Sequence, residues 1–164
     1  PRLVLPFSTV LVSLIDFALA LALLAAVMLV HGFVPGPQAL LMPLFLILAL
    51  LASAGPGLLI ASLNVKYRDF RYIVPFIVQF GLYITPVAFT SDAVLGNPSI
   101  PEALKLLYSC NPLVAVVDGF RWCLLGGAPI HLQGFLISCG ATLLLLVLGV
   151  ARFRRTERGF ADII

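Results

Sequence analysis

The fold of this chain is decided by one charged stretch, Asn64-Val65-Lys66-Tyr67-Arg68-Asp69-Phe70-Arg71. Four charges fall within these eight residues, and long apolar runs lie on both sides, at 39–63 and 72–89. A single charged side chain at the centre of a bilayer costs about 2.5–3.5 kcal/mol on insertion scales. The stretch, called here the charged turn, therefore predicts a short loop at a membrane surface between two spans.

The composition supports a membrane protein. The 164 residues are 62% hydrophobic and 10% charged, and the mean hydropathy is +1.14. Soluble domains carry about 25% charged residues, so a soluble fold would have too little polar surface to cover this core. The net charge of +3 does not predict a nucleic-acid partner, because the basic residues lie at the ends of the apolar runs.

Four apolar segments reach the length of about 20 residues that a membrane-spanning helix needs. They cover residues 8–30, 39–63, 72–89 and 132–151. We therefore predict an all-α membrane protein with four transmembrane helices.

The distribution of Lys and Arg predicts the orientation. If the charged turn is cytoplasmic, eight of the ten Lys and Arg residues fall on the cytoplasmic side, and only Lys105 and Arg121 fall outside. Short cytoplasmic loops carry such an excess of positive residues. Both ends of this chain are then expected to be cytoplasmic, with the turn at 31–37 and the long connection at 90–131 outside.

The long outer connection predicts two short helices. Ser99 followed by Glu102 has the spacing of a capping box, with Ser99 as the N-cap of a helix that runs to Ser109. Asn111 before Pro112 predicts a second N-cap, and Gly126-Gly127 a second helix end. A helix of 14 residues is about 21 Å long, too short for a hydrocarbon core of about 30 Å. The two helices are therefore expected to form a re-entrant pair joined at Cys110.

Several sequence blocks resemble the type-2 ABC transporter permeases. The charged turn is followed by Tyr72-Ile73-Val74-Pro75-Phe76 and Tyr83-Ile84-Thr85-Pro86-Val87. Further blocks are Pro1-Arg2-Leu3-Val4-Leu5-Pro6, then Asn111-Pro112-Leu113 with Gly119-Phe120-Arg121-Trp122, and Phe153-Arg154-Arg155-Thr156-Glu157-Arg158. They cover nearly the whole chain, and the most similar branch is the polysaccharide exporters for O-antigen, capsule or teichoic acid.

The resemblance implies a membrane subunit that pairs with a second copy of itself and with two ATPase subunits. It implies export of lipid-linked polysaccharide across the bacterial cytoplasmic membrane. Residues 1–164 then correspond to the C-terminal part of a six-span permease, without an N-terminal interfacial helix and two spans. The chain has no Gly-x-x-x-x-Gly-Lys-Ser/Thr loop, so ATP is expected to bind the partner subunit and no cofactor is expected here. No catalytic or metal-ligating motif is present in the sequence, so the chain is not expected to be an enzyme.

Three groups of residues are predicted to work in transport. The first is the charged turn, because orientation needs only Lys and Arg, whereas Asn64, Tyr67 and Asp69 add groups suited to docking an ATPase. The alternative is a plain positive anchor. The predicted docking residues are Asn64, Lys66, Tyr67, Arg68, Asp69 and Arg71.

The second group is a stripe of aromatic side chains with one amide on a single helical face. Such a stripe can line a path for sugar rings, and ordinary helix packing is the alternative. Its members, called here the aromatic stripe, are Tyr72, Phe76, Gln79, Phe80 and Tyr83.

The third group is an outer gate in the re-entrant pair. Asp118 and Arg121 are three residues apart, so they are predicted to pair as a latch, with an exposed ion pair of little value as the alternative. Trp122 suits a membrane interface. The predicted gate residues are Asn111, Pro112, Asp118, Arg121 and Trp122.

Asp16 lies about 12 Å into the first predicted span. An intramembrane carboxylate is a functional hypothesis by default, and a polar contact at a helix seam is the alternative. Rival functions are an exporter of drugs or other small lipophilic molecules, a membrane anchor, and an intramembrane enzyme that uses Asp16 with Asp118. The predicted topology argues against the enzyme, because it places these two carboxylates toward opposite membrane faces.

Overall fold

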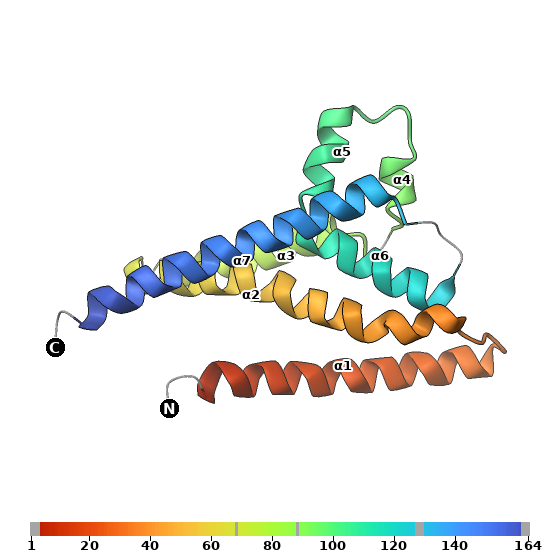
Figure 1. The fold of residues 1–164 in the computed structure, drawn as a ribbon, viewed down its shortest axis with the longest axis horizontal. Coiled ribbons are helices and arrows are strands. Elements are labelled where there is room, and N and C mark those ends of the chain that lie inside the picture. Colours follow the sequence, from red (N-terminus) through yellow and green to blue (C-terminus); the bar gives the residue numbers. More distant parts are fainter. Residues whose placement is uncertain (1–3, 68, 88, 127–129, 162–164) are drawn as a thin grey trace. The chain divides into compact units, whose positions relative to one another are not determined.

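The computed structural model describes residues 4–67, 69–87, 89–126 and 130–161, and every regular element in these ranges is a helix (Figure 1). This confirms an all-α fold. The chain divides into two compact units, residues 1–35 and 36–164.

The first unit consists of one long helix, α1 (Val4–Val30). Its 27 residues reach about 40 Å, enough to cross a membrane. The helix ends where predicted, because Gly32 adopts a left-handed conformation with φ 67°. The Phe33 N–H then donates to the Met28 carbonyl at 2.9 Å, and the Gly32 N–H donates to the Leu29 carbonyl at 3.0 Å. These bonds satisfy carbonyls that the helix end would leave free.

The second unit holds the remaining elements. A short 3₁₀ helix, η1 (Pro37–Leu41), leads into α2 (Met42–Lys66), and the charged turn leads into α3 (Phe70–Ile84). The connection at 90–131, called here the outer connection after its predicted side, contains α4 (Asp92–Leu95), α5 (Glu102–Ser109) and α6 (Pro112–Leu125). The chain returns through α7 (Leu132–Ala161).

Helices α2, α6 and α7 pack together and form the core of this unit (Figure 1). Phe45 of α2 is buried, and its ring centroid lies 6.3 Å from that of Phe120 and 6.2 Å from that of Phe135. The same ring covers Gly119, where a Cβ atom would collide with it. Gly119 therefore allows α6 to approach α2 closely.

Two glycines bring the backbones of α2 and α7 into contact. A Cβ added at Gly149 would lie 2.5 Å from the Gly55 carbonyl oxygen and 3.3 Å from the Leu58 Cβ. A Cβ added at Gly55 would lie 2.7 Å from the Leu146 backbone nitrogen. Small residues at such crossings allow the dispersion contacts that hold helices together in a membrane.

Three helices are long and apolar enough to span a membrane, within the segments 12–30, 37–65 and 132–156. A fourth span is reached if α5 and α6, bent by 81° at their junction, are counted as one. The span predicted at 72–89 is wrong in length. Helix α3 has 15 residues, about 22 Å, because Thr85 before Pro86 is pushed into an extended conformation with ψ 141°.

The predicted ranges of the two short helices are confirmed except at the start of α5. The predicted N-cap Ser99 is wrong, because the residue that precedes α5 is Pro101. The Ser99 N–H instead donates to the Asn97 side chain at 2.9 Å, which holds Ser99 in the preceding turn. Helix α6 begins and ends as predicted, with Asn111 as N-cap, Pro112 as first residue and a left-handed Gly126 at φ 64°.

Candidate functional site

The charged turn is a compact connection between two helices, as predicted. The Tyr67 N–H donates to the Leu63 carbonyl at 2.7 Å, and the Phe70 N–H donates to the Tyr67 carbonyl at 3.1 Å. Asp69 precedes α3, but its side chain does not cap that helix. Arg68 and the side chain of Lys66 lie outside the described residues.

Among the described side chains of the turn, Asn64 and Phe70 are half-buried and the others are exposed. Tyr67, Asp69 and Arg71 are exposed, and the Tyr67 and Phe70 ring centroids are 6.4 Å apart. The Arg71 guanidinium lies 6.0 Å from the Tyr72 ring centroid, a cation–π distance. The Asn64 Oδ1 is buried and accepts no hydrogen bond from the part of the chain that the structure describes. A backbone-bonded turn with exposed charged and aromatic groups has the chemistry of a docking surface.

All five side chains of the aromatic stripe are exposed in the structure. Helix α3 has no buried residue within the described chain, and its packing partner is α2. Tyr72, Phe80 and Tyr83 are 69%, 66% and 74% exposed. The stripe is therefore available to a lipid, a partner or a transport path.

Asn111 links the outer ends of α3 and α6. Its Oδ1 accepts a hydrogen bond from the Leu113 N–H at 3.0 Å, and its Nδ2 donates to the Thr85 Oγ1 at 3.1 Å. The Thr85 hydroxyl in turn donates to the Gly81 carbonyl at 2.7 Å. One amide thus caps α6 and holds the end of α3.

Ser138 of α7 completes this connection. Its hydroxyl donates to the Asn111 carbonyl at 2.6 Å and accepts from the Ala115 N–H at 3.1 Å. The Ser138 hydroxyl therefore bridges the Ala115 N–H and the Asn111 carbonyl, which would otherwise form the first i→i−4 backbone bond of α6. Thr142, one turn further along α7, donates to the Ser138 carbonyl at 2.9 Å. Ser138 and Thr142 are buried, so the outer end of the bundle is fixed by a buried polar network.

Sequence reasoning missed Ser138, Thr142 and Thr85. The available signal was a pair of hydroxyl residues four apart in the last span, since polar groups in a membrane helix commonly contact another helix. Asn111, the shared partner of Thr85 and Ser138, lies 26 and 27 residues away from them along the chain, so sequence spacing could not identify these contacts.

The predicted Asp118–Arg121 latch is wrong. Within the described residues no ion pair joins the two side chains. The Arg121 Nη1 donates to the Phe89 carbonyl at 2.6 Å, and its Nη2 donates to the Val87 carbonyl at 2.9 Å. The chain after α3 has carbonyls without helical partners, and the planar guanidinium fork can satisfy two of them at once. Arg121 therefore joins α6 to the segment that follows α3.

Asp118 lies near this fork but has a different environment. Burial raises the pKa of its carboxyl, while the Ser91 hydroxyl and the charges of Arg121 and His131 oppose that rise. It lines a cavity of about 40 Å³ at the outer end of the unit. The lining residues are Thr90, Ser91, Asp92, Asp118, Arg121, Ile130 and His131.

His131 lines both this cavity and a larger groove of about 140 Å³ between α5 and α7. Its Nε2 lies 3.0 Å from the Asp92 Oδ1, so the first residues of α4 and the start of α7 are in contact. The groove is lined by Leu95, Glu102, Lys105, Leu106, Ser109, His131, Gln133, Gly134 and Ile137.

Trp122 and Asp16 are the remaining residues that the sequence singled out. Trp122 is half-buried, and its carbonyl accepts from the Gly126 N–H at the end of α6. Asp16 lies in the interior of α1 with an exposed side chain. Among the described residues, no group of three or more His, Cys, Asp or Glu could hold a metal ion.

The chain is similar to permeases of polysaccharide export. It is 24% identical over 165 residues to an O-antigen export system permease protein RfbA from Klebsiella pneumoniae, covering 100% of this chain and 61% of the relative. It is 26% identical over 121 residues to a protein of the same name from Myxococcus xanthus, covering 74% of this chain and 45% of the relative. The chain thus spans about three fifths, or less, of the length of these relatives.

The match to a transporter family covers most of the chain. Residues 2–125, which run from the start of α1 to the end of α6, match the family described as ABC-2 type transporter. The helices that can span a membrane agree with this match and make the chain a multi-pass membrane protein. This chain belongs to the ABC-2 type transporter family.

Proposed function

We propose that this chain forms part of the membrane-spanning subunit of an ABC exporter that moves lipid-linked polysaccharide across the bacterial cytoplasmic membrane. The observation that carries the proposal is the similarity over 100% of the chain to a permease named for O-antigen export. The all-helical fold, with long spans and a bent outer pair, agrees with such a subunit.

The exporter would contain a second copy of the permease and two ATPase subunits. A transport subunit of this family does not itself need to bind ATP, and the sequence has no phosphate-binding loop of the Walker type. Nucleotide would therefore bind the partner. The proposed orientation places both ends of this chain and the charged turn in the cytoplasm.

Topology can be tested with single cysteines in a background without Cys110, Cys123 and Cys139. A membrane-impermeant thiol reagent should label cysteines placed at Gly36 and Gly96 from outside. It should not label cysteines placed at Val65 and Thr156 until the membrane is opened. Outside labelling at Val65 would invert the orientation and remove the docking role of the charged turn.

The charged turn is the proposed docking surface for the ATPase. Its backbone bonds fix the relation of α2 to α3, so a force on the turn would reach both helices. Arg71→Glu should reduce co-purification of the ATPase and transport-coupled ATP hydrolysis while membrane insertion is unchanged. Lys105→Glu, a charge reversal at the outer end, is the control and should not affect co-purification. Equal ATPase recovery with both variants would leave the turn as an anchor.

The aromatic stripe is the proposed lining for sugar rings, because its side chains are exposed and include the amide of Gln79. Changing Tyr72, Phe80 and Tyr83 to Leu keeps α3 apolar and removes the ring faces. Polysaccharide export should fall while the amount of protein in the membrane stays constant. Unchanged export would assign the stripe to lipid contact or helix packing.

The exporter function itself is tested by complementation. The protein, expressed with a compatible ATPase, should restore surface polysaccharide to a bacterium that lacks its own O-antigen permease. A variant ATPase that cannot hydrolyse ATP is the control and should give no restoration. Resistance to lipophilic drugs without restored polysaccharide would assign the subunit to a small-molecule exporter instead.

A further inference from the structure

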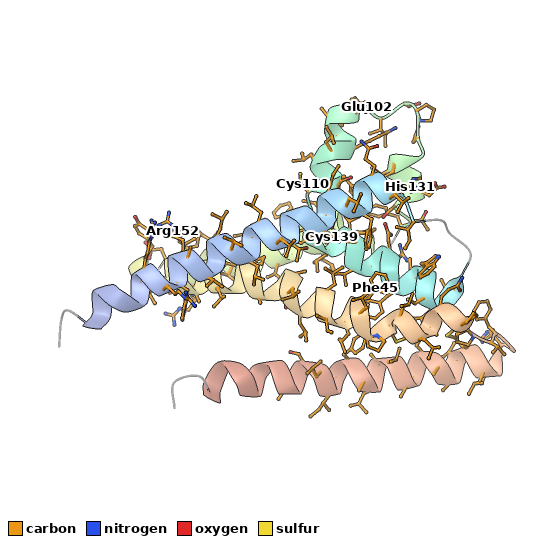
Figure 2. All side chains as sticks on the ribbon, in the orientation of Figure 1. Phe45, Glu102, Cys110, His131, Cys139 and Arg152 are labelled. Carbon is orange, nitrogen blue, oxygen red and sulfur yellow. The ribbon has the colours of Figure 1, made fainter. Side chains whose placement is uncertain are left out.

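The last helix does not end with its apolar run. The span predicted at 132–151 continues as unbroken helix to Ala161. Three arginines, Arg152, Arg154 and Arg155, follow the apolar run within four residues, and their side chains are exposed. Figure 2 shows Arg152 on the half of α7 that leads to the C-terminus, beside the end of α2.

The glycine contact between α2 and α7 fixes the level of these arginines. The two helices run in the same direction (Figure 1), and Gly149 lies against Gly55 and Leu58. Arg152 is three residues beyond Gly149, whereas Lys66 is eight residues beyond Leu58. At about 1.5 Å per residue, the backbone of Arg152 lies about 7 Å short of the level of Lys66.

This offset places the arginines in a particular layer of the membrane. The hydrocarbon core is about 30 Å thick and the whole bilayer about 40–45 Å, so each headgroup layer is about 5–7 Å deep. If the charged turn lies at the water side of this layer, Arg152 lies at its hydrocarbon side. Arg155, about 4.5 Å further along α7, lies within the layer. The guanidinium groups are thus at the depth of lipid phosphates.

Arg152 and Arg155 also share one side of α7, because residues three apart are neighbours on a helix. Arg154 is turned about 100° from Arg155 and lies on another side. Among the side chains that the structure describes, no carboxylate forms an ion pair with these arginines. The Thr156 hydroxyl donates to the Arg152 carbonyl at 3.0 Å, so it bonds to the backbone of its own helix.

We propose that Arg152 and Arg155 form a binding site for the phosphate group of a lipid, in the leaflet at the charged-turn end of α7. A planar guanidinium binds two phosphate oxygens at once, and two of them on one helix face can hold a phosphate from two sides. The phosphate can belong to a membrane phospholipid or to a diphosphate-linked isoprenoid. The site follows from helix register and charge and does not rest on the proposed export function.

The test measures binding of fluorescent phosphatidylglycerol to the purified full chain in uncharged detergent. Arg152→Lys combined with Arg155→Lys keeps the charge and the helix but removes the bidentate geometry. Affinity should fall about tenfold in this double variant, equivalent to about 1.4 kcal/mol. Arg154→Lys, the same change on another side of the same helix, should change affinity by less than about twofold. Unaltered affinity in the double variant, or an equal loss with Arg154→Lys, overturns the proposal.

Competition distinguishes the source of the phosphate. Stronger displacement of the fluorescent lipid by geranylgeranyl diphosphate than by unlabelled phosphatidylglycerol assigns the site to a diphosphate carrier. Equal displacement by the two assigns it to membrane lipid in general. Displacement by inorganic phosphate as effective as that by either lipid refutes a lipid site. The two single variants, measured in the same way, keep the test decisive if the double variant is poorly expressed.

Discussion

Replacing Ser138 with alanine tests whether the buried network fixes the outer end of the bundle. The substitution removes the hydroxyl that donates to the Asn111 carbonyl and accepts from the Ala115 N–H. Ala115 is fully buried, so water cannot replace the lost partner. The Ala115 N–H would be left without its partner, whereas the Asn111 carbonyl would still accept from the Val114 N–H at 3.2 Å.

The expected loss of stability follows mainly from the buried Ala115 N–H. A buried donor or acceptor without a partner costs about 1–3 kcal/mol. Hydrogen bonds between helices in a membrane contribute about 0.6 kcal/mol on average and reach about 1.7 kcal/mol. Closure of a direct bond from the Ala115 N–H to the Asn111 carbonyl would recover part of the loss. We therefore expect Ser138→Ala to lower the free energy of unfolding by about 1–2 kcal/mol.

The measurement is equilibrium unfolding of the purified protein in mixed micelles with increasing denaturing detergent. Ser53→Ala is the matched control, because the Ser53 hydroxyl is exposed and bonds to the Leu50 carbonyl of its own helix at 2.9 Å. It should change the free energy by less than about 0.5 kcal/mol. If Ser138→Ala is no more destabilising than Ser53→Ala, the network does not hold α6 to α7.

Three further predictions concern the same end of the bundle and the helix crossing. Asn111→Ala should destabilise the protein by about 1–2 kcal/mol, because it removes the cap of α6 and the bond to Thr85; a change below 0.5 kcal/mol in the same unfolding assay would contradict this. Gly149→Ala should destabilise the protein by several kcal/mol, because the added Cβ collides with α2. Gly140→Ala is the control and should stabilise it by up to about 1 kcal/mol, because nothing outside its own helix lies within 4 Å of the added Cβ. Equal effects of the two variants would refute the close crossing. Arg121→Lys should increase small-ion leakage of the assembled exporter, because an ammonium lacks the guanidinium fork that holds two carbonyls. Asp118→Asn should leave the leakage unchanged. Larger leakage with Asp118→Asn than with Arg121→Lys would support a latch that depends on Asp118.

The sequence by itself determined the class of fold and most of the helix ends. Charge cannot lie in hydrocarbon, so the charged turn and the apolar runs beside it already separated α2 from α3. Local chemistry also determined α6, because Asn111, Pro112 and Gly126 act through bonds and dihedral angles within a few residues. The end of α3 was missed, although Pro86 was a local signal, because hydropathy continued to Phe89.

The tertiary structure alone decided which polar groups meet. Residue spacing placed Asp118 and Arg121 on neighbouring positions, but the carbonyls of Val87 and Phe89, 34 and 32 residues away from Arg121 along the chain, bind the guanidinium instead. The contacts of Ser138 and the level of Arg152 depend on how α7 packs against α2 and α6. A hydrogen bond or a helix register between distant segments is set by the packing of whole helices, and residue spacing along one helix carries no information about it.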